Sequence, residues 1–310
     1  MNFLVTAKNV LLMLVYAFPG FLLVKKKLIK KESISAFAAV LLFVNQPALS
    51  IYSLQQELYS PDLIKNMGIV FLMSAILQSG MMLSMWAIFR KKYSSDASYR
   101  VYTASAALGN VGFMGIPVLH ALLPDFPAAI CYSAVFIVSM NILSWTLGAF
   151  LLTGKKEYIS VKKAFLNPAV LTLAVALPLF FTRYSLAENL PTVNEVVTVL
   201  AKMSTPMCML ILGMRFALVP IKKMFSDPRI YMNAVLKGIV FPLICLGIMS
   251  LLPLDKNIVK AFYIMACMPS ANLVLSLSEL FGGGQETACY CVLTSTTLSM
   301  ATIPLMMLLI

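Results

Sequence analysis

Ten apolar segments, each roughly 20 residues long, occupy most of this 310-residue chain. A helix of roughly 20 apolar residues spans the hydrocarbon core of a bilayer. Lipid offers no hydrogen-bond partner to a bare backbone, and the alternating pattern of barrel strands is absent, so the segments are predicted to be helices. They lie near residues 4–24, 34–54, 66–89, 101–123, 128–152, 165–183, 192–214, 230–251, 258–281 and 287–309. The predicted fold class is an all-α polytopic membrane protein with ten transmembrane helices.

The composition excludes a water-soluble fold. Hydrophobic residues make up 60% of the chain, charged residues make up 12%, and the mean hydropathy is +0.89. A soluble domain carries about twice that charged fraction. Because no long hydrophilic block interrupts the segments, residues 1–310 are predicted to form a single membrane domain. The first segment lacks a basic leader and a small-residue cleavage site, so it is interpreted as a span rather than a signal peptide.

The formal net charge of +12 is an orientation signal rather than a sign of nucleic-acid binding. Most of the 24 lysines and arginines fall in loops that would share one side of the membrane: Lys25, Lys26, Lys27, Lys30 and Lys31; Arg90, Lys91, Lys92 and Arg100; Lys155, Lys156, Lys162 and Lys163; Arg215, Lys222, Lys223 and Arg229. The opposite loops hold only Lys65, Arg183, Lys256 and Lys260. The positive-inside rule therefore predicts that the basic loops are cytoplasmic and that both termini are extracellular.

Residues that carry chemistry are scarce. The six cysteines lie in apolar segments without a CxxC spacing, and the only histidine is His120. Packing is the predicted role of the cysteines, so no metal site and no cofactor are expected. No catalytic triad, phosphate-binding loop or dinucleotide fingerprint is present, so the chain is predicted not to be an enzyme.

The prolines suggest an internal repeat. Pro19 and Pro178, Pro47 and Pro206, and Pro61 and Pro220 are each 159 residues apart. The same offset relates AILQSG at Ala75–Gly80 to AVLKG at Ala234–Gly238. Each half holds five segments, so the two halves would cross the membrane in opposite directions. Two inverted repeats are predicted, at about 1–154 and 160–310.

The fourth and ninth segments correspond under this repeat, and each is interrupted midway. The first carries LGNVGFMGIPV (Leu108–Val118) and the second MACMPSAN (Met265–Asn272). Proline removes a backbone donor and glycine weakens a helix, so both helices are predicted to break, at Pro117 and at Pro269. Paired interruptions of this kind indicate the binding site of a transporter, because half-helix N-termini carry partial positive charge. The alternative is a pair of kinks whose glycines permit tight helix packing.

Polar residues near these breaks are the candidate site. An amide at membrane depth needs partners, and next to a break Asn110 and Asn272 are predicted to contact substrate, although each could instead bond a neighbouring backbone. Lys202 could pair with a substrate carboxylate or with Glu195, and Lys237 is interpreted as snorkelling to the membrane surface. Further candidates beside the breaks are Gly109, Gly112, Gly115 and Ser270. A second group surrounds two equivalent prolines, Pro47 and Pro206: Asn45, Ser204 and Thr205. These three polar residues could contact substrate or could instead satisfy carbonyls freed by the kinks at those prolines.

Four stretches of the chain resemble the auxin efflux carrier family, which includes the PIN-FORMED exporters of plants and bacterial permeases. They are VNQPALS (Val44–Ser50), GNVGFMGIPV, STPMCMLILGM (Ser204–Met214), and MPSAN followed by SELFGGGQE and LTSTTLSMATIPL. The short loop KKEYISVKK between the halves fits a bacterial member in the cytoplasmic membrane.

The resemblance implies a carrier built from two units. A scaffold that dimerises would be formed by helices one, two, six and seven. A transport unit, formed by helices three to five and eight to ten, would slide against this scaffold in an elevator mechanism. Helices four and nine would cross at their breaks. Asn110 matches the family's substrate-contacting asparagine, and Pro117 and Pro269 match its crossover prolines. Asn45 and Pro47 would face them from the scaffold.

A basic residue five positions before a proline of helix eight also recurs in the family, and Lys237 before Pro242 matches it, so a role in transport is the alternative to snorkelling for Lys237.

The function predicted from these features is secondary transport of a small organic anion, a carboxylate, by efflux or exchange. No Asp or Glu lies deep in a segment, so a carboxylate-based cation site is not evident. An inside-negative potential favours exit of an anion by about 2.3 kcal/mol per charge per 100 mV. The alternatives are a sodium- or proton-coupled symporter resembling the bile acid carriers and, less favoured, a membrane sensor that does not transport.

Overall fold

The computed structural model describes residues 3–92, 96–160, 162, 164, 166, 168–220, 227–281 and 283–310. Within them the chain is helical, and its one extended pairing is a single two-residue bridge. Lys163, Lys222 and Lys223, which contribute to the predicted basic loops, lie outside the described residues.

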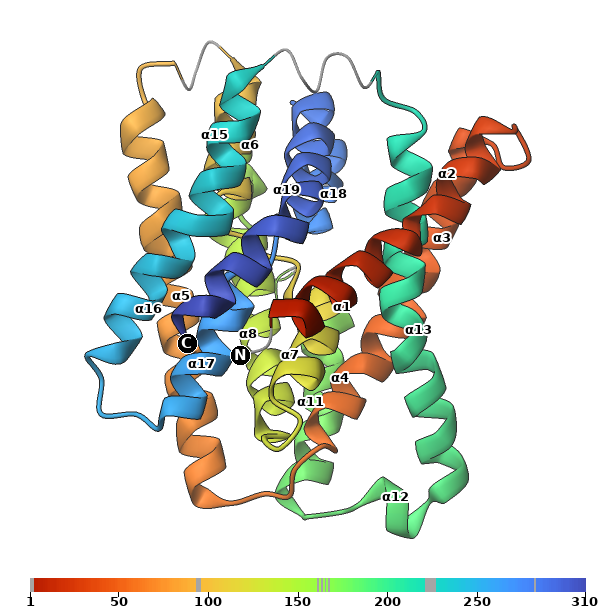
Figure 1. Ribbon diagram of the computed structural model, residues 1–310, viewed down its shortest axis with the longest axis vertical. Helices are drawn as coiled ribbons and strands as arrows, with labels where there is room; N and C mark the ends of the chain where they lie inside the picture. Colours follow the sequence, from red (N-terminus) through yellow and green to blue (C-terminus); the bar gives the residue numbers. More distant parts are fainter. Residues whose placement is uncertain are drawn as a thin grey trace.

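The helices follow the order of the predicted segments (Figure 1). In the first half they are α1 (Phe3–Val15), α2 (Ala17–Lys25), η1 (Lys31–Ser33), α3 (Ile34–Val40), η2 (Leu41–Asn45), α4 (Gln46–Leu54), α5 (Pro61–Phe89), α6 (Ala97–Ser105), η3 (Val111–Gly115), α7 (Ile116–Leu122), α8 (Ala128–Leu143), η4 (Ser144–Gly148), α9 (Ala149–Thr153) and η5 (Lys156–Tyr158). In the second half they are α11 (Pro168–Phe181), α12 (Leu186–Asn189), α13 (Pro191–Phe216), α15 (Pro228–Val235), η6 (Leu236–Val240), α16 (Phe241–Ser250), α17 (Lys256–Ala266), α18 (Asn272–Phe281), α19 (Gln285–Met306) and η7 (Met307–Leu309).

Six helical stretches among the described residues are long and apolar enough to cross a membrane. They are Lys31–Leu54, Pro61–Phe89, Ala128–Thr153, Pro191–Phe216, Pro228–Ser250 and Gln285–Leu309. Shorter apolar helices cover Val10–Lys25, Val111–Leu122, Val170–Phe181 and Asn272–Phe281. The prediction of an all-helical integral membrane protein is confirmed.

Helix starts outside the apolar core are fixed by side-chain caps. Ser60, Asp96, Asp227 and Asp255 each accept a hydrogen bond from a backbone N–H in the first turn of α5, α6, α15 and α17, at 2.7–3.1 Å. Such a cap satisfies one of the donors that a helix N-terminus leaves unpaired.

Three prolines are each preceded by a π-helical turn. The turns η2, η3 and η6 end two residues before Pro47, Pro117 and Pro242 respectively. Proline cannot donate to the carbonyl four residues earlier and its ring crowds that carbonyl, so the helix widens locally instead of breaking. These prolines therefore lie in the first turn of α4, α7 and α16, whereas Pro206 lies inside the continuous helix α13.

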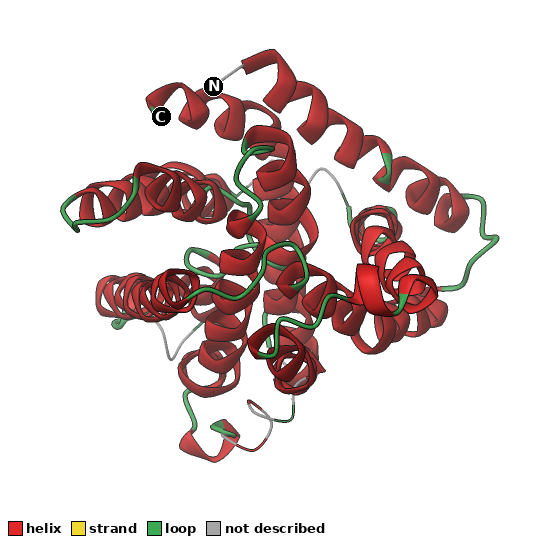
Figure 2. Ribbon diagram, turned by 90° about the horizontal axis from the view of Figure 1, so that it is seen from below, coloured by secondary structure: helices red, strands yellow, loops and turns green. Residues whose placement is uncertain are grey.

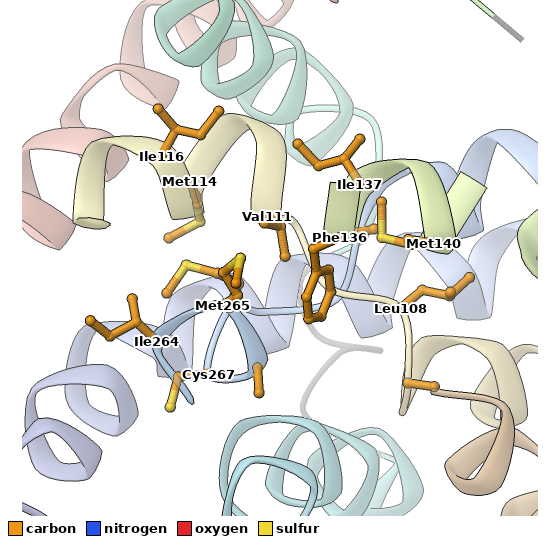
Figure 3. Close-up of a cluster of buried hydrophobic side chains, with 14 of the residues drawn as sticks. Leu108, Val111, Met114, Ile116, Phe136, Ile137, Met140, Ile264, Met265 and Cys267 are labelled. Atoms are coloured by element: carbon orange, nitrogen blue, oxygen red, sulfur yellow. The ribbon is translucent and has the colours of Figure 1, made fainter. Parts of the chain in front are cut away.

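The fourth and ninth segments are interrupted, as predicted, but one interruption is displaced. Helix α6 stops at Ser105 and helix resumes at Val111, so the break precedes Pro117 instead of falling on it. The second break, residues 267–271 between α17 and α18, contains Pro269. Residues 106–110 and 267–271 are called the crossover below. Apolar side chains from both interrupted segments and from α8, among them Val111, Phe136 and Met265, surround the crossover (Figure 3).

The two ends of the chain lie close together in both ribbon views (Figures 1 and 2). Helix α1 packs against α19 there, and α2 packs against α13. The second contact is made by glycines. A Cβ on Gly213 would fall well inside van der Waals contact with the carbonyl of Ala17, and one on Gly20 would do the same to the carbonyl of Leu210. Small residues allow this close approach of two helix backbones in a membrane.

We expect Gly213→Ala to separate α2 from α13 and to destabilise the protein by roughly 1–3 kcal/mol, the usual cost of overpacking. Gly247→Ala is the matched control, because a Cβ at Gly247 meets no atom within 4 Å. It should leave stability unchanged or raise it by up to about 1 kcal/mol. Melting temperatures of the purified protein in detergent measure both; equal values would contradict the glycine contact.

Candidate functional site

The two breaks are joined by backbone hydrogen bonds. The N–H of Asn110 donates to the carbonyl of Pro269 at 2.7 Å, and the N–H of Ala271 donates to the carbonyl of Leu108 at 2.9 Å. Gly109 and Ser270 form an antiparallel bridge between them. Each interrupted helix thus supplies partners for groups that the other leaves open, which makes irregular backbone tolerable inside a membrane protein. The predicted meeting of the two breaks is confirmed.

A network of buried side chains holds one flank of the crossover. The Ser270 hydroxyl donates to the carbonyl of Ser105 at 2.8 Å, and the Ser270 N–H donates to Ser295 Oγ at 3.1 Å. The Ser105 hydroxyl donates in turn to Asn233 Oδ1 at 2.6 Å, and Asn233 Nδ2 donates to the carbonyl of Tyr102 at 2.9 Å. Ser270, a predicted substrate contact, is here fully buried and bonded to the protein.

Lys237 lies on the same flank, and its snorkelling interpretation is wrong. Its side chain is 0% exposed, and its ammonium donates to the carbonyl of Ala266, the last residue of α17, at 2.7 Å. The Nζ atom also lies 4.9 Å from the centre of the Phe241 ring. No carboxylate pairs with it within the described ranges. A cation at a helix C-terminus is favourable, since the last carbonyls carry partial negative charge.

The ammonium of Lys237 also explains the glycine at position 109. A Cβ on Gly109 would lie 3.2 Å from Lys237 Nζ and 3.4 Å from the carbonyl oxygen of Met268. The crossover chain therefore passes directly over a buried positive charge.

A cavity opens on the other flank. It encloses about 100 Å³ and is lined by Gly109, Asn110, Gly112 and Asn272 of the candidate site. We call it the crossover cavity. Further polar walls come from Gln46 on α4, Asn141 on α8, Arg215 on α13 and Ser276 on α18. Among the described residues that line it, none is acidic.

Two amide atoms of the crossover cavity lack a hydrogen-bond partner. They are Nε2 of Gln46, a donor, and Oδ1 of Asn272, an acceptor. Buried polar atoms are nearly always paired, and leaving one unpaired costs about 1–3 kcal/mol. Gln46 and Asn272 therefore each keep an unused hydrogen-bonding atom, buried just behind the cavity wall.

Cys208 of α13 links the two asparagines. Asn272 Nδ2 donates to Cys208 Sγ at 3.1 Å, and Asn110 Nδ2 lies 4.0 Å from the same sulfur. Asn110 is only 5% exposed. A thiol is a weak acceptor, so neither amide is strongly held by this contact. Both remain able to turn toward a better acceptor in the cavity.

A second cavity, of about 280 Å³, lies further from the α13 C-terminus. It is lined by Pro117, Lys202 and Pro206 of the predicted site, together with Tyr52 and His120. We call it the outer cavity. Within the described ion pairs none joins Lys202 to Glu195, the alternative that the sequence left open.

One hydrogen bond lies between the two cavities. The hydroxyl of Thr205 on α13 donates to the carbonyl of Phe113 at 2.7 Å. This carbonyl lies four residues before Pro117, which has no N–H to offer it. Thr205 thus satisfies a carbonyl freed by Pro117 on another helix, whereas the sequence interpretation expected it to serve the kink of the proline that follows it, Pro206.

The remaining candidates lie away from the crossover cavity. Asn45 donates to the carbonyl of Leu200 at 2.9 Å and accepts at its own carbonyl from Ser204 at 3.4 Å, which ties α13 to the second segment. Pro47 is in the first turn of α4 beside these contacts. Gly115 faces Met268, whose Cγ would lie 3.3 Å from an added Cβ.

Four polar residues that line the crossover cavity are not among the candidates that the sequence offers: Gln46, Asn141, Arg215 and Ser276. Gln46 lies in the VNQPALS motif, next to the candidate Asn45. Arg215 directly follows the predicted apolar segment 192–214, which makes it resemble a loop charge, whereas α13 extends to Phe216. In the part of the chain that the structure describes, no group of three or more His, Cys, Asp or Glu side chains is placed to hold a metal ion.

Interrupted helices whose open ends meet beside a cavity are typical of membrane carriers. The family model described as "Membrane transport protein" matches residues 5–307, so the chain belongs to that family, which includes the auxin efflux carriers that its motifs resemble. The protein is therefore a membrane transporter, and membership of a transport family fits the prediction that it is not an enzyme. A search of curated proteins finds no match.

We expect Lys237→Met to leave a folded protein whose ligand binding is impaired. The substitution removes the donor to the carbonyl of Ala266 but also the cost of keeping a charge out of water, and these opposing effects should hold the melting temperature within a few degrees. Loss of one positive charge beside the crossover should lower affinity for an anion roughly tenfold, which corresponds to about 1.4 kcal/mol.

Thermal shift and equilibrium binding on the same preparation separate the two effects. Lys237→Arg, which keeps the charge, is the control. Unchanged anion affinity in Lys237→Met would show that the ammonium has only a structural role.

Proposed function

We propose that this transporter moves a small organic carboxylate, which binds in the crossover cavity. The observation that carries the proposal is the wall of that cavity. It combines an arginine, two amides with unpaired atoms and a crossover backbone over a buried lysine, with no acidic residue among the described lining residues. Such a wall favours a negative, hydrogen-bonding solute.

The size of the crossover cavity supports a solute of a few carbon atoms. About 100 Å³ accommodates a short mono- or dicarboxylate more readily than an indole acid. The helices that resume at Val111 and Asn272 both begin at the cavity, so their N-termini add partial positive charge.

Alternating access is proposed to expose this site to either side. The crossover cavity and the outer cavity lie at successive levels of α13, near residues 211–215 and 201–206 respectively, with the Thr205–Phe113 hydrogen bond between them. In this proposal the transport unit (helices three to five and eight to ten, numbered as predicted segments) slides against a scaffold of helices one, two, six and seven. Asn45 and Ser204, which bond each other, are 159 residues apart, the offset of the proposed inverted repeats.

The proposed setting is the bacterial cytoplasmic membrane, with both termini outside and two copies joined through their scaffolds. The ends of α5 and α13 and the starts of α6 and α15 share one end of the molecule (Figure 1), and the predicted cytoplasmic charges cluster at these helix ends. The crossover cavity would then face the cytoplasm, because Arg215 lies at that end of α13.

The proposed direction is efflux or exchange driven by the membrane potential. For a monoanion, 100 mV is worth about 2.3 kcal/mol, which corresponds to a gradient of about fiftyfold. Coupling to Na⁺ or H⁺ is the second candidate, and it is less favoured because none of the described residues that line the crossover cavity is acidic. A sensor that binds without transport is less favoured.

Flux in proteoliposomes tests the proposal. The purified protein should exchange labelled carboxylate from a panel of acetate, malonate, succinate and malate, with malonamide as the neutral control. An imposed potential of about 100 mV, inside negative, should raise efflux of a monoanion, and replacing Na⁺ by K⁺ should not reduce it. Potential-independent or strictly Na⁺-dependent flux would exclude the driving force proposed here.

We expect Asn110→Ala to lower flux at least tenfold, since a buried amide that contacts substrate typically contributes 1–3 kcal/mol. Asn257→Ala is the matched control, because Asn257 is exposed in the first turn of α17. Equal flux in both variants would move the substrate site away from Asn110.

A further inference from the structure

Arg215 occupies an unusual position for a residue at the end of a membrane helix. It lies in the last turn of α13, yet its side chain is only 14% exposed and lines the crossover cavity. A guanidinium that is mostly removed from water needs an anionic partner, since burying an unpaired charge is strongly unfavourable.

Glu279 provides that partner from another helix. The two terminal nitrogens of the Arg215 guanidinium both donate to the Glu279 carboxylate. Nη1 donates to Oε1, and Nη2 donates to Oε2 at 3.3 Å. This is the two-pronged geometry by which arginine recognises carboxylates. Glu279 lies on α18, the helix that begins at Asn272 of the cavity, and α13 and α18 both rise toward the top of Figure 1.

Arg215 needs this ion pair more than Glu279 does. Glu279 is 48% exposed, so its carboxylate can return to water at little cost, whereas Arg215 cannot. A carboxylate solute in the cavity would offer the guanidinium the same group that Glu279 offers. One carboxylate can therefore replace the other with no net loss of ion pairing at Arg215.

We propose that Arg215 is the carboxylate-binding residue of the crossover cavity and that Glu279 is its exchangeable partner, displaced when substrate binds. This rests on the proposed function and deepens it, because it names the group that selects anions. Exchange also has a mechanical result. With Glu279 released, α18 loses its ion pair to α13 and keeps only the weaker hydrogen bond of Asn272 to Cys208, so substrate binding loosens the attachment of α18 to α13.

The exchange makes opposite predictions for the two residues. Glu279→Gln removes the carboxylate that competes for Arg215. It should therefore tighten binding of a carboxylate ligand severalfold. Arg215→Gln should weaken binding at least tenfold, and Arg215→Lys, which keeps the charge without the planar fork, should weaken it less. In the double variant the benefit of Glu279→Gln should vanish, since its effect acts through Arg215.

Binding is measured by isothermal calorimetry on the full-length protein, with the tightest carboxylate of the panel above and malonamide as the neutral probe. Glu157→Gln is the matched control, because Glu157 forms an ion pair with Lys155 at 3.4 Å in which both side chains are more than half exposed. It should leave affinity unchanged. Melting temperatures without ligand show whether each variant is folded, and Glu279→Gln and Arg215→Lys are the two that change the fewest packed atoms.

The outcomes separate the two proposals. If carboxylates bind and Asn110→Ala weakens them, but Glu279→Gln leaves affinity unchanged or lowers it, the exchange is wrong and the proposed function stands. If Glu279→Gln tightens binding equally in the Arg215→Gln background, the effect is a general field effect and the exchange is again wrong. If no carboxylate binds the unmodified protein, both proposals fail together.

Discussion

Two backbone hydrogen bonds determine the architecture at the centre of this protein. Where Asn110 donates to Pro269 and Ala271 donates to Leu108, each interrupted helix satisfies groups that lipid or an apolar core could not. An unpaired amide at that depth would cost several kcal/mol, so the two breaks are stable only together. The cavity walls follow from this pairing, because it fixes where the helices resume and therefore where Asn110 and Asn272 lie.

Positive charge is distributed around this pairing on both flanks. Lys237 lies beneath Gly109 and binds the end of α17, while Arg215 reaches the cavity from α13. Neither residue lies on the two chain segments that form the crossover. The interrupted helices supply neutral amides and open backbone, and the neighbouring helices supply the charge. An anion between them would meet fixed dipoles and cations that need little rearrangement, which is how proteins stabilise charge away from water.

Much of this arrangement could be predicted from residue types alone, because apolar length, glycine and proline have direct consequences in lipid. The helical fold and the two interrupted segments follow from them, and the family follows from the resemblance of four sequence stretches. The first break was predicted at Pro117 but lies before it. Proline is well accommodated in the first turn of a helix, so Pro117 follows a π turn and does not interrupt the helix. The snorkelling predicted for Lys237 is wrong because the distance of a residue from a helix end does not determine which neighbouring helices cover its side chain. The unpaired atom of Gln46 and the pairing of Arg215 with Glu279 depend on packing between distant helices, which no local pattern records.

The close approach of the α2 and α13 backbones, at Gly20 and at Gly213, limits how the molecule can change shape. Backbone meets backbone there, with no layer of side chains whose rotamers could readjust as one helix shifted past the other. Helices α2 and α13 are thus expected to travel, or to stand still, as a single rigid body. Relative displacement must then be accommodated on the opposite face of α13, where a hydroxyl, a thiol and a guanidinium make the contacts that can be broken and remade.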